Sequence, residues 1–120
     1  MHQPVEVIGM PPERRLVVEF SIVTVGTQGT SLSEYVARAC EAVKNSGVNY
    51  QLTPMCTIFE AGSLDQAFEV IRSAHEAVLE AGAKRVLTSI KIDDRADKGR
   101  TMEDKVKAVE NKLSKQDHQI

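Results

Sequence analysis

Apolar and polar positions alternate along two runs of this chain. The run from Leu16 to Val25 is rich in β-branched residues and alternates in part, and the run from Arg85 to Asp93 alternates in its second half. Alternation puts successive side chains on opposite faces, so each run predicts a strand with one face toward a core. The residues expected on the core side are Val18, Phe20 and Ile22 in the first run and Val86, Thr88, Ile90 and Ile92 in the second.

Two shorter strand-like runs lie in the middle of the chain, from Val48 to Pro54 and from Met55 to Ala61. Pro54 joins them and cannot donate a hydrogen bond to a central ladder, so it suits a turn or an edge. The two runs therefore predict an antiparallel pair connected by a turn.

Three other stretches repeat their apolar residues at the helical spacing i, i+3, i+4. Each begins with a capping signature, at Ser31 to Glu34, Ser63 to Gln66 and Thr101 to Asp104. Gly47 and Gly82 follow the first two stretches and suit the left-handed residue that commonly ends a helix. The apolar stripes are Leu32, Tyr35, Val36, Ala39, Cys40 and Val43; Leu64, Ala67, Phe68, Ile71, Ala74, His75 and Val78; and Met102, Val106, Val109 and Leu113.

The order of these elements is β-α-β-β-α-β-α, which predicts an α+β fold: a ferredoxin-like β-α-β-β-α-β sandwich with an additional C-terminal helix. Right-handed crossovers would place the two main helices on one face of a four-stranded antiparallel sheet and leave the other face uncovered. We expect residues 1–15 to form a flexible N-terminal arm, residues 16–114 a single domain, and residues 115–120 a tail. The third helix would cover a sheet edge or a partner.

Composition narrows the possible partners. The chain has 120 residues, of which 42% are hydrophobic, enough for one core. Fifteen Lys and Arg against seventeen Asp and Glu give a net charge of -2, whereas nucleic-acid-binding domains usually carry a positive excess. Only 4% of the residues are aromatic, so base-stacking surfaces are scarce. Nucleic acid is therefore not an expected partner.

The chain contains no apolar run near the ~20 residues that span a bilayer, and its N-terminus lacks a signal pattern. We therefore expect a cytoplasmic protein without a membrane partner. Cys40 and Cys56 have neither CxxC spacing nor a neighbouring His, so they are interpreted as thiols that act as small hydrophobes.

The uncovered sheet face is where we expect function. Alternation places Val17, Glu19, Ser21 and Val23 on it from the first strand, Asn49, Gln51 and Thr53 from the second, and Leu87, Ser89 and Lys91 from the fourth. In the third strand either Met55, Thr57 and Phe59 or Cys56, Ile58 and Glu60 point outward. The second set is favoured because Phe59 is the better core residue.

Two interpretations of this face are open. In one, Glu19 and Lys91 form a cross-strand ion pair, and Ser21 and Ser89 are small polar fillers at an oligomer interface. In the other, the polar groups converge in a small-molecule pocket on a partly apolar surface that oligomerisation closes. Contiguous exposed apolar residues usually mark a contact surface, so both interpretations predict self-association.

Catalytic and metal sites are hard to assemble from this sequence. His75 lies on an apolar helical stripe, where a satisfied, partly buried imidazole is more common than a general base. The turn Gly26-Thr27-Gln28-Gly29 lacks the spacing of a dinucleotide or P-loop motif. The acids Asp93, Asp94 and Asp97 are interrupted by Arg95 and Lys98 and lack a calcium-loop pattern, which favours surface charge or a hinge that contacts a neighbouring subunit.

Several segments resemble the small thiamine-binding protein family. They are Gly26-Thr27, Ser33-Glu34-Tyr35-Val36, Ser46-Gly47, the hairpin Pro54-Met55-Cys56-Thr57-Ile58-Phe59-Glu60, and Ile90-Lys91-Ile92-Asp93-Asp94-Arg95-Ala96-Asp97-Lys98. The resemblance covers roughly residues 16 to 113. Cys56 stands where the family often has Gly, and Thr24 where it often has Pro.

This resemblance implies a ferredoxin-like protein that forms dimers or tetramers, is not an enzyme, and binds thiamine or its hydroxymethylpyrimidine moiety without a separate cofactor. Thiamine carries a fixed cation that suits a carboxylate, and its aminopyrimidine offers hydrogen-bond donors and acceptors. The expected ligand-binding residues are Glu19, Ser21, Thr53, Thr57 and Glu60, with Lys91 positioning a carboxylate through an ion pair. The alternatives are an oligomeric structural or regulatory module that binds another small ligand, and an enzyme that uses His75 or a cysteine.

Overall fold

Within the described residues, seven regular elements form in the order predicted from the sequence. The computed structural model describes residues 15–26, 32–95 and 101–118. The elements are β1 (Leu16–Thr24), α1 (Leu32–Asn45), β2 (Tyr50–Leu52), β3 (Thr57–Ala61), α2 (Leu64–Glu80), β4 (Val86–Asp94) and α3 (Met102–His118). The sequence predictions for the arm before residue 15, the turn at 27–29, the Ser31 cap, and Asp97 and Lys98 lie outside the described residues.

The four strands form one antiparallel sheet in the order β2-β3-β1-β4. β1 pairs with β4 along its whole length, from Leu16↔Asp94 to Thr24↔Val86. On its other side β1 pairs with β3 only from Leu16↔Ala61 to Phe20↔Thr57. The α+β prediction with a four-stranded antiparallel sheet is therefore confirmed, and the second half of β1 has a strand neighbour on one side only among the described strands.

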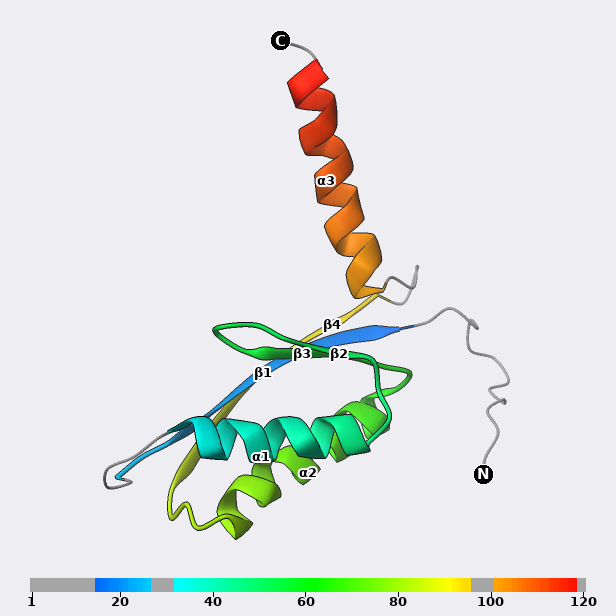
Figure 1. The fold of residues 1–120 in the computed structure, drawn as a ribbon. Coiled ribbons are helices and arrows are strands. Elements are labelled where there is room, and N and C mark those ends of the chain that lie inside the picture. The colour runs from blue at the N-terminus through cyan, green and yellow to red at the C-terminus, as the bar shows by residue number, and fades with distance from the viewer. Residues whose placement is uncertain (1–14, 27–31, 96–100, 119–120) are drawn as a thin grey trace.

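The core lies between the sheet and the two helices α1 and α2, which run along the same face of the sheet (Figure 1). Phe59, Val18 and Val43 have no exposed surface, and each contributes about 1.5–3 kcal/mol by burial. The rings of Phe20 and Phe59 meet edge to face with centroids 6.0 Å apart. Alternation along β1 and β3 thus directs these side chains to the helical layer, as predicted.

The cap of α2 forms as predicted, with one difference in its partners. The Ser63 hydroxyl accepts from the Gln66 N–H at 3.1 Å, but the Gln66 side chain reaches back to the Gly62 N–H at 2.7 Å, one residue before the cap. The predicted apolar stripe of α2 is wrong at Leu64 and Phe68, which are 44% and 53% exposed, whereas Val70 is buried. The buried face is rotated toward Val70 because α1 and the sheet contact the helix from two directions.

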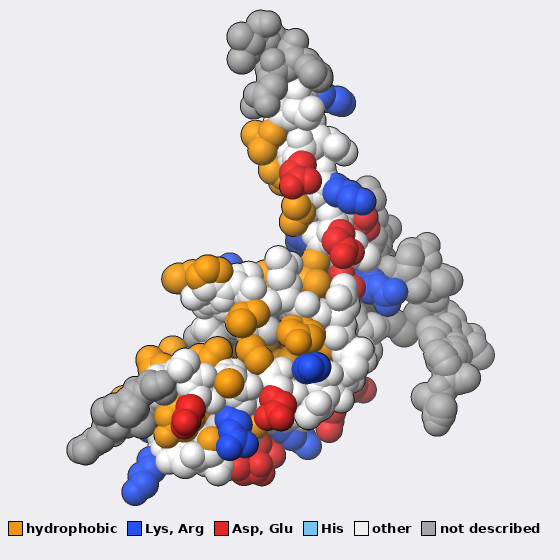
Figure 2. Space-filling model, in the orientation of Figure 1, with side chains coloured by type: hydrophobic (Ala, Val, Ile, Leu, Met, Phe, Trp, Pro, Cys, Tyr) orange, Lys and Arg blue, Asp and Glu red, His pale blue; other side chains and the backbone are white. Residues whose placement is uncertain are grey.

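The helix α3 projects away from the sheet instead of lying across it (Figure 1). Its first turn is a complete capping box, in which the Thr101 hydroxyl accepts from the Asp104 N–H and the Asp104 carboxylate accepts from the Thr101 N–H. Val106, Val109 and Leu113 are more than half exposed, and Figure 2 shows hydrophobic side chains gathered along one side of this helix. No helix within the described residues is long and apolar enough to cross a bilayer.

Candidate ligand-binding site

The sheet face opposite α1 and α2 carries a row of alternating side chains from β1. Glu19 lies between Ile58 of β3 and Lys91 of β4, and Val17 lies between Glu60 and Asp93. This register places Ile58 and Glu60 on the open face, which is the outward side of the third strand that the sequence favours. Thr57 shares the helical side with buried Phe59.

Glu19 and Lys91 face each other across β1 and β4. The Lys91 Nζ lies 3.9 Å from a Glu19 carboxylate oxygen, and the Lys91 and Glu19 side chains are 82% and 45% exposed. Exposed pairs at such a distance contribute only about 0–1 kcal/mol. The Glu19 carboxylate is therefore held loosely and can turn toward a ligand cation at little cost.

Glu60 has a structural partner that its position in the sequence does not reveal. Its side chain is nearly buried, and its carboxylate accepts a hydrogen bond of 2.7 Å from the backbone N–H of Met102, at the start of α3. A carboxylate at this point satisfies one of the unpaired N–H groups of the helix N-terminus and complements its dipole. Glu60 therefore attaches α3 to the sheet, which limits its capacity to bind a ligand.

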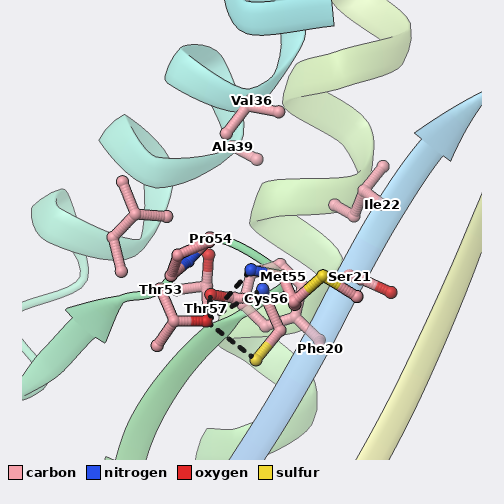
Figure 3. A pocket seen from close by; sticks show the side chains of 11 residues that line it. Phe20, Ser21, Ile22, Val36, Ala39, Thr53, Pro54, Met55, Cys56 and Thr57 are labelled. Atoms are coloured by element: carbon pink, nitrogen blue, oxygen red, sulfur yellow. Dashed lines mark hydrogen bonds between the residues drawn. The ribbon is translucent and has the colours of Figure 1, made fainter.

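A small hollow opens where the β2–β3 turn approaches the second half of β1. It measures about 110 Å³. Figure 3 shows Val36 and Ala39 of α1 and Ile22 of β1 around it, together with the turn residues. Its lining is mainly apolar, and it includes three of the six predicted site residues, Ser21, Thr53 and Thr57. We call it the hairpin hollow.

Thr53 and Thr57 already have structural partners within the hairpin hollow. The Thr53 hydroxyl donates to the Cys56 carbonyl at 2.9 Å and accepts from the Cys56 N–H at 3.1 Å, which closes the turn around Pro54. The Thr57 hydroxyl is buried and lies 3.8 Å from the Cys40 Sγ on α1. These two residues therefore shape the wall of the hollow. Ser21 is the third predicted polar residue of the lining and belongs to β1 instead of the turn.

The hairpin hollow also borders a part of the β1 backbone that has no partner among the residues of β3. The residue types in the sequence could not have predicted this feature. The Glu60 N–H donates to the Asn49 carbonyl, so the backbone groups of Glu60 point away from β1. Successive residues of a strand direct their N–H and C=O groups to opposite sides, so those of Thr57 point toward Phe20 in β1. Ile22 is the next residue of β1 whose N–H and C=O point to that side. It lies past the last pair with β3, so of the described strands only β4 pairs with it. The short length of the hairpin thus leaves this donor and acceptor facing the hollow.

A second hollow, of about 100 Å³, lies at the other end of β1. Its lining consists of Arg15, Val17, Asp93, Arg95 and Lys105, and we call it the basic hollow. The Lys105 ammonium binds the Asp93 carboxylate, and this hydrogen bond and charge, with a smaller contribution from Arg95, lower the pKa of Asp93. Asp93 and Arg95 thus belong to a cluster of acidic and basic side chains that includes Lys105 of α3. The interpretation of Asp93 and Arg95 as surface charge did not include this contact with α3.

The remaining candidate chemistry is structural where it is described. The His75 Nδ1 lies 2.7 Å from the Thr88 Oγ1, and this hydrogen bond links α2 to β4. The His75 imidazole is therefore partly buried and has a partner. In the described parts of the chain, no group of three or more His, Cys, Asp or Glu side chains could hold a metal ion. Both cysteines are free thiols.

Comparison with known proteins gives one consistent family. A family model described as "Thiamine-binding protein" matches residues 18–110. A UPF0045 protein of Methanothermobacter thermautotrophicus is 47% identical over 98 residues, covering 82% of this chain and 99% of that protein. The crystal structure of a hypothetical protein from Methanocaldococcus jannaschii aligns with a TM-score of 0.72 and 38% identity, over 80% of this chain and 96% of the other. A Thermotoga maritima protein, for which a role in thiamine biosynthesis or salvage has been suggested, aligns with a TM-score of 0.68 and 25% identity, over 79% and 98% of the two chains.

Proposed function

This chain belongs to the thiamine-binding protein family, and from that premise we propose that it is a non-enzymatic protein that binds thiamine or its hydroxymethylpyrimidine moiety. The ligand would lie along β1, with its pyrimidine ring in the hairpin hollow and its thiazolium over the open sheet face. We further infer that the strand order β2-β3-β1-β4, with α1 and α2 on one face, is the ferredoxin-like arrangement.

The observation that carries this proposal is the backbone of Ile22 at the edge of the hairpin hollow. An aminopyrimidine presents a ring-nitrogen acceptor beside an amino donor, and one extended residue presents an N–H donor beside a C=O acceptor. The two patterns are complementary. The apolar walls formed by Val36, Pro54 and Met55 suit the flat faces and the methyl group of the ring.

The charge of thiamine suits Glu19, which lies further along β1 on the open face. The thiazolium is a fixed cation, and the loosely held Glu19 carboxylate can approach it without losing a strong partner. Lys91 would keep Glu19 near the sheet when the ligand is absent. Hydroxymethylpyrimidine has no fixed charge, so this interaction would distinguish the two ligands.

A second copy of the chain would complete the site. Ligand pockets usually measure about 300–1,000 Å³, whereas the hairpin hollow of a single chain measures about 110 Å³. Val23 and Leu87 are about half exposed at the same end of the open face and offer an apolar contact surface. Closure by a second copy would cover both the ligand and these residues.

Calorimetric titration with thiamine and with hydroxymethylpyrimidine tests the proposal. We expect both ligands to bind. Glu19→Gln should weaken the binding of thiamine about threefold to fivefold, as for a partly exposed ion pair, and should leave the binding of hydroxymethylpyrimidine as strong as before. Glu76→Gln on α2 removes one carboxylate from the helical layer and serves as the control. Absence of heat with both ligands in the unaltered protein would reject the proposal, and sedimentation as a monomer with ligand bound would reject closure by a second copy.

A further inference from the structure

The basic hollow joins side chains that are far apart in the sequence. Arg15 precedes β1, Arg95 follows β4, and Lys105 belongs to the first turn of α3. Among the described residues, three cations therefore surround a space that holds one carboxylate, that of Asp93, in a chain whose net charge is negative. A volume of about 100 Å³ exceeds the ~30 Å³ share of a single water molecule, which leaves room for an oxyanion.

The acids that flank the hollow leave its positive charge in excess. Asp93 is the acid of the lining, and it contacts Lys105 directly. Asp94 is paired with Leu16, so alternation places it on the other face of the sheet. Glu60 flanks Val17, but its carboxylate is directed at the Met102 N–H. The described lining therefore carries three positive groups and one negative group, and two of its cations are guanidinium groups.

The basic hollow lies on the same face of β1 as Glu19. Val17 and Glu19 are two residues apart, which is about 7 Å along a strand. A thiazolium held at Glu19 would therefore direct its hydroxyethyl arm either toward solvent or along β1 toward the basic hollow. A phosphate ester on that arm would fall within reach of Arg15 and Arg95, whose planar guanidinium groups suit phosphate oxygens.

We propose that the basic hollow is an anion subsite that takes the phosphate group of a phosphorylated thiamine, and that the protein prefers the monophosphate ester to thiamine itself. This inference rests on the proposed function, since Glu19 and the hairpin hollow set where the rest of the ligand lies. The three cations would each contribute to the preference, with Lys105 acting through its contact with Asp93.

Titration with thiamine and thiamine monophosphate at low ionic strength tests the preference. We expect the monophosphate to bind about tenfold more tightly, as one or two charge-assisted hydrogen bonds allow. Arg15→Gln and Arg95→Gln should each reduce this ratio, and the double variant should bring it close to one. Arg72→Gln, which removes an exposed guanidinium from α2 on the far side of the sheet, should keep the full ratio.

Equal affinity of the unaltered protein for the two ligands would overturn the inference while leaving the proposed function intact, and so would a preference that survives in the double variant. If neither ligand binds, the proposed function fails, and the hollow is then tested alone with inorganic phosphate followed by phosphorus NMR. Phosphate that binds the unaltered protein but not the double variant would support an anion subsite. Phosphate binding that is absent, or is the same in both proteins, would overturn it.

Discussion

The buried Glu60 carboxylate attaches the start of α3 to the sheet, and Glu60→Ala tests its contribution. The Glu60 carboxylate accepts from the Met102 N–H at 2.7 Å. Hydrogen bonds to charged groups contribute about 1.5–3 kcal/mol. Among the described side chains, the other attachments of the helix are buried Met102 and the partly exposed Lys105–Asp93 pair, while Val106, Val109 and Leu113 are mostly exposed. Its 17 residues are only slightly more than the ~12–15 below which an isolated helix is marginal in water. We therefore expect the loss to appear as local opening of α3.

Amide hydrogen exchange measured by NMR reports this opening directly. A loss of about 1.5–3 kcal/mol corresponds to exchange about 10- to 150-fold faster at Met102 and Lys105, whose N–H groups are hydrogen-bonded to Glu60 and Thr101. Glu60→Gln keeps an acceptor of similar size and should show an intermediate effect. Glu103→Ala removes an exposed carboxylate from the same turn and serves as the control. Equal exchange rates at Met102 in the Glu60→Ala and Glu103→Ala variants would refute the reasoning.

Two further variants test the electrostatics and the backbone. Lys105 holds the pKa of Asp93 below its ordinary value of 3.8, so the stability that this pair contributes is present above about pH 4 and is lost as the pH falls through the lowered pKa. Asp93→Asn should therefore lower the free energy of unfolding by up to about 1 kcal/mol near pH 7, the upper value for a partly exposed pair. In a series of urea titrations this loss should disappear at the acid end. A loss of stability that is independent of pH would contradict this. Gly47 has φ +85°, and no atom lies within 4 Å of the position that a Cβ would take, so Gly47→Ala should cost about 1–2 kcal/mol in urea unfolding from backbone strain alone. Gly62→Ala, at a position without positive φ, is the matched control, and equal costs at both glycines would exclude the backbone explanation.

The fold was predictable from the sequence because its signals are local. Alternation in β1 and β4 put Val18, Phe20 and Ile92 on the core side, and the register agrees. The exposure of Phe68 was not predictable, because helical spacing defines a stripe but not the direction from which α1 and the sheet contact it. The division of the chain into arm, domain and tail stays a prediction.

The six predicted site residues show where local patterns stop being informative. Glu19, Lys91 and Ser21 lie on or beside the open face, as alternation requires. Thr53, Thr57 and Glu60 are polar residues of the right type, yet each has a structural partner in the turn, in α1 or in α3. A hydroxyl or carboxylate has the same appearance in a sequence whether it binds a ligand or closes a turn. Their roles as ligand contacts stay predictions that the titrations above address.

The sequence by itself determined the elements, their order and the core-facing side of β1 and β4, because these follow from periodicity and capping within a few residues; the register with β1 decided which side of β3 faces the core. Only the tertiary structure decided which polar groups have structural partners and which charges meet. The Ile22 backbone faces the hairpin hollow because β3 ends early, and Arg15, Arg95 and Lys105 share the basic hollow because three chain segments meet there. Such contacts depend on strand register and on helix placement, which no local pattern encodes.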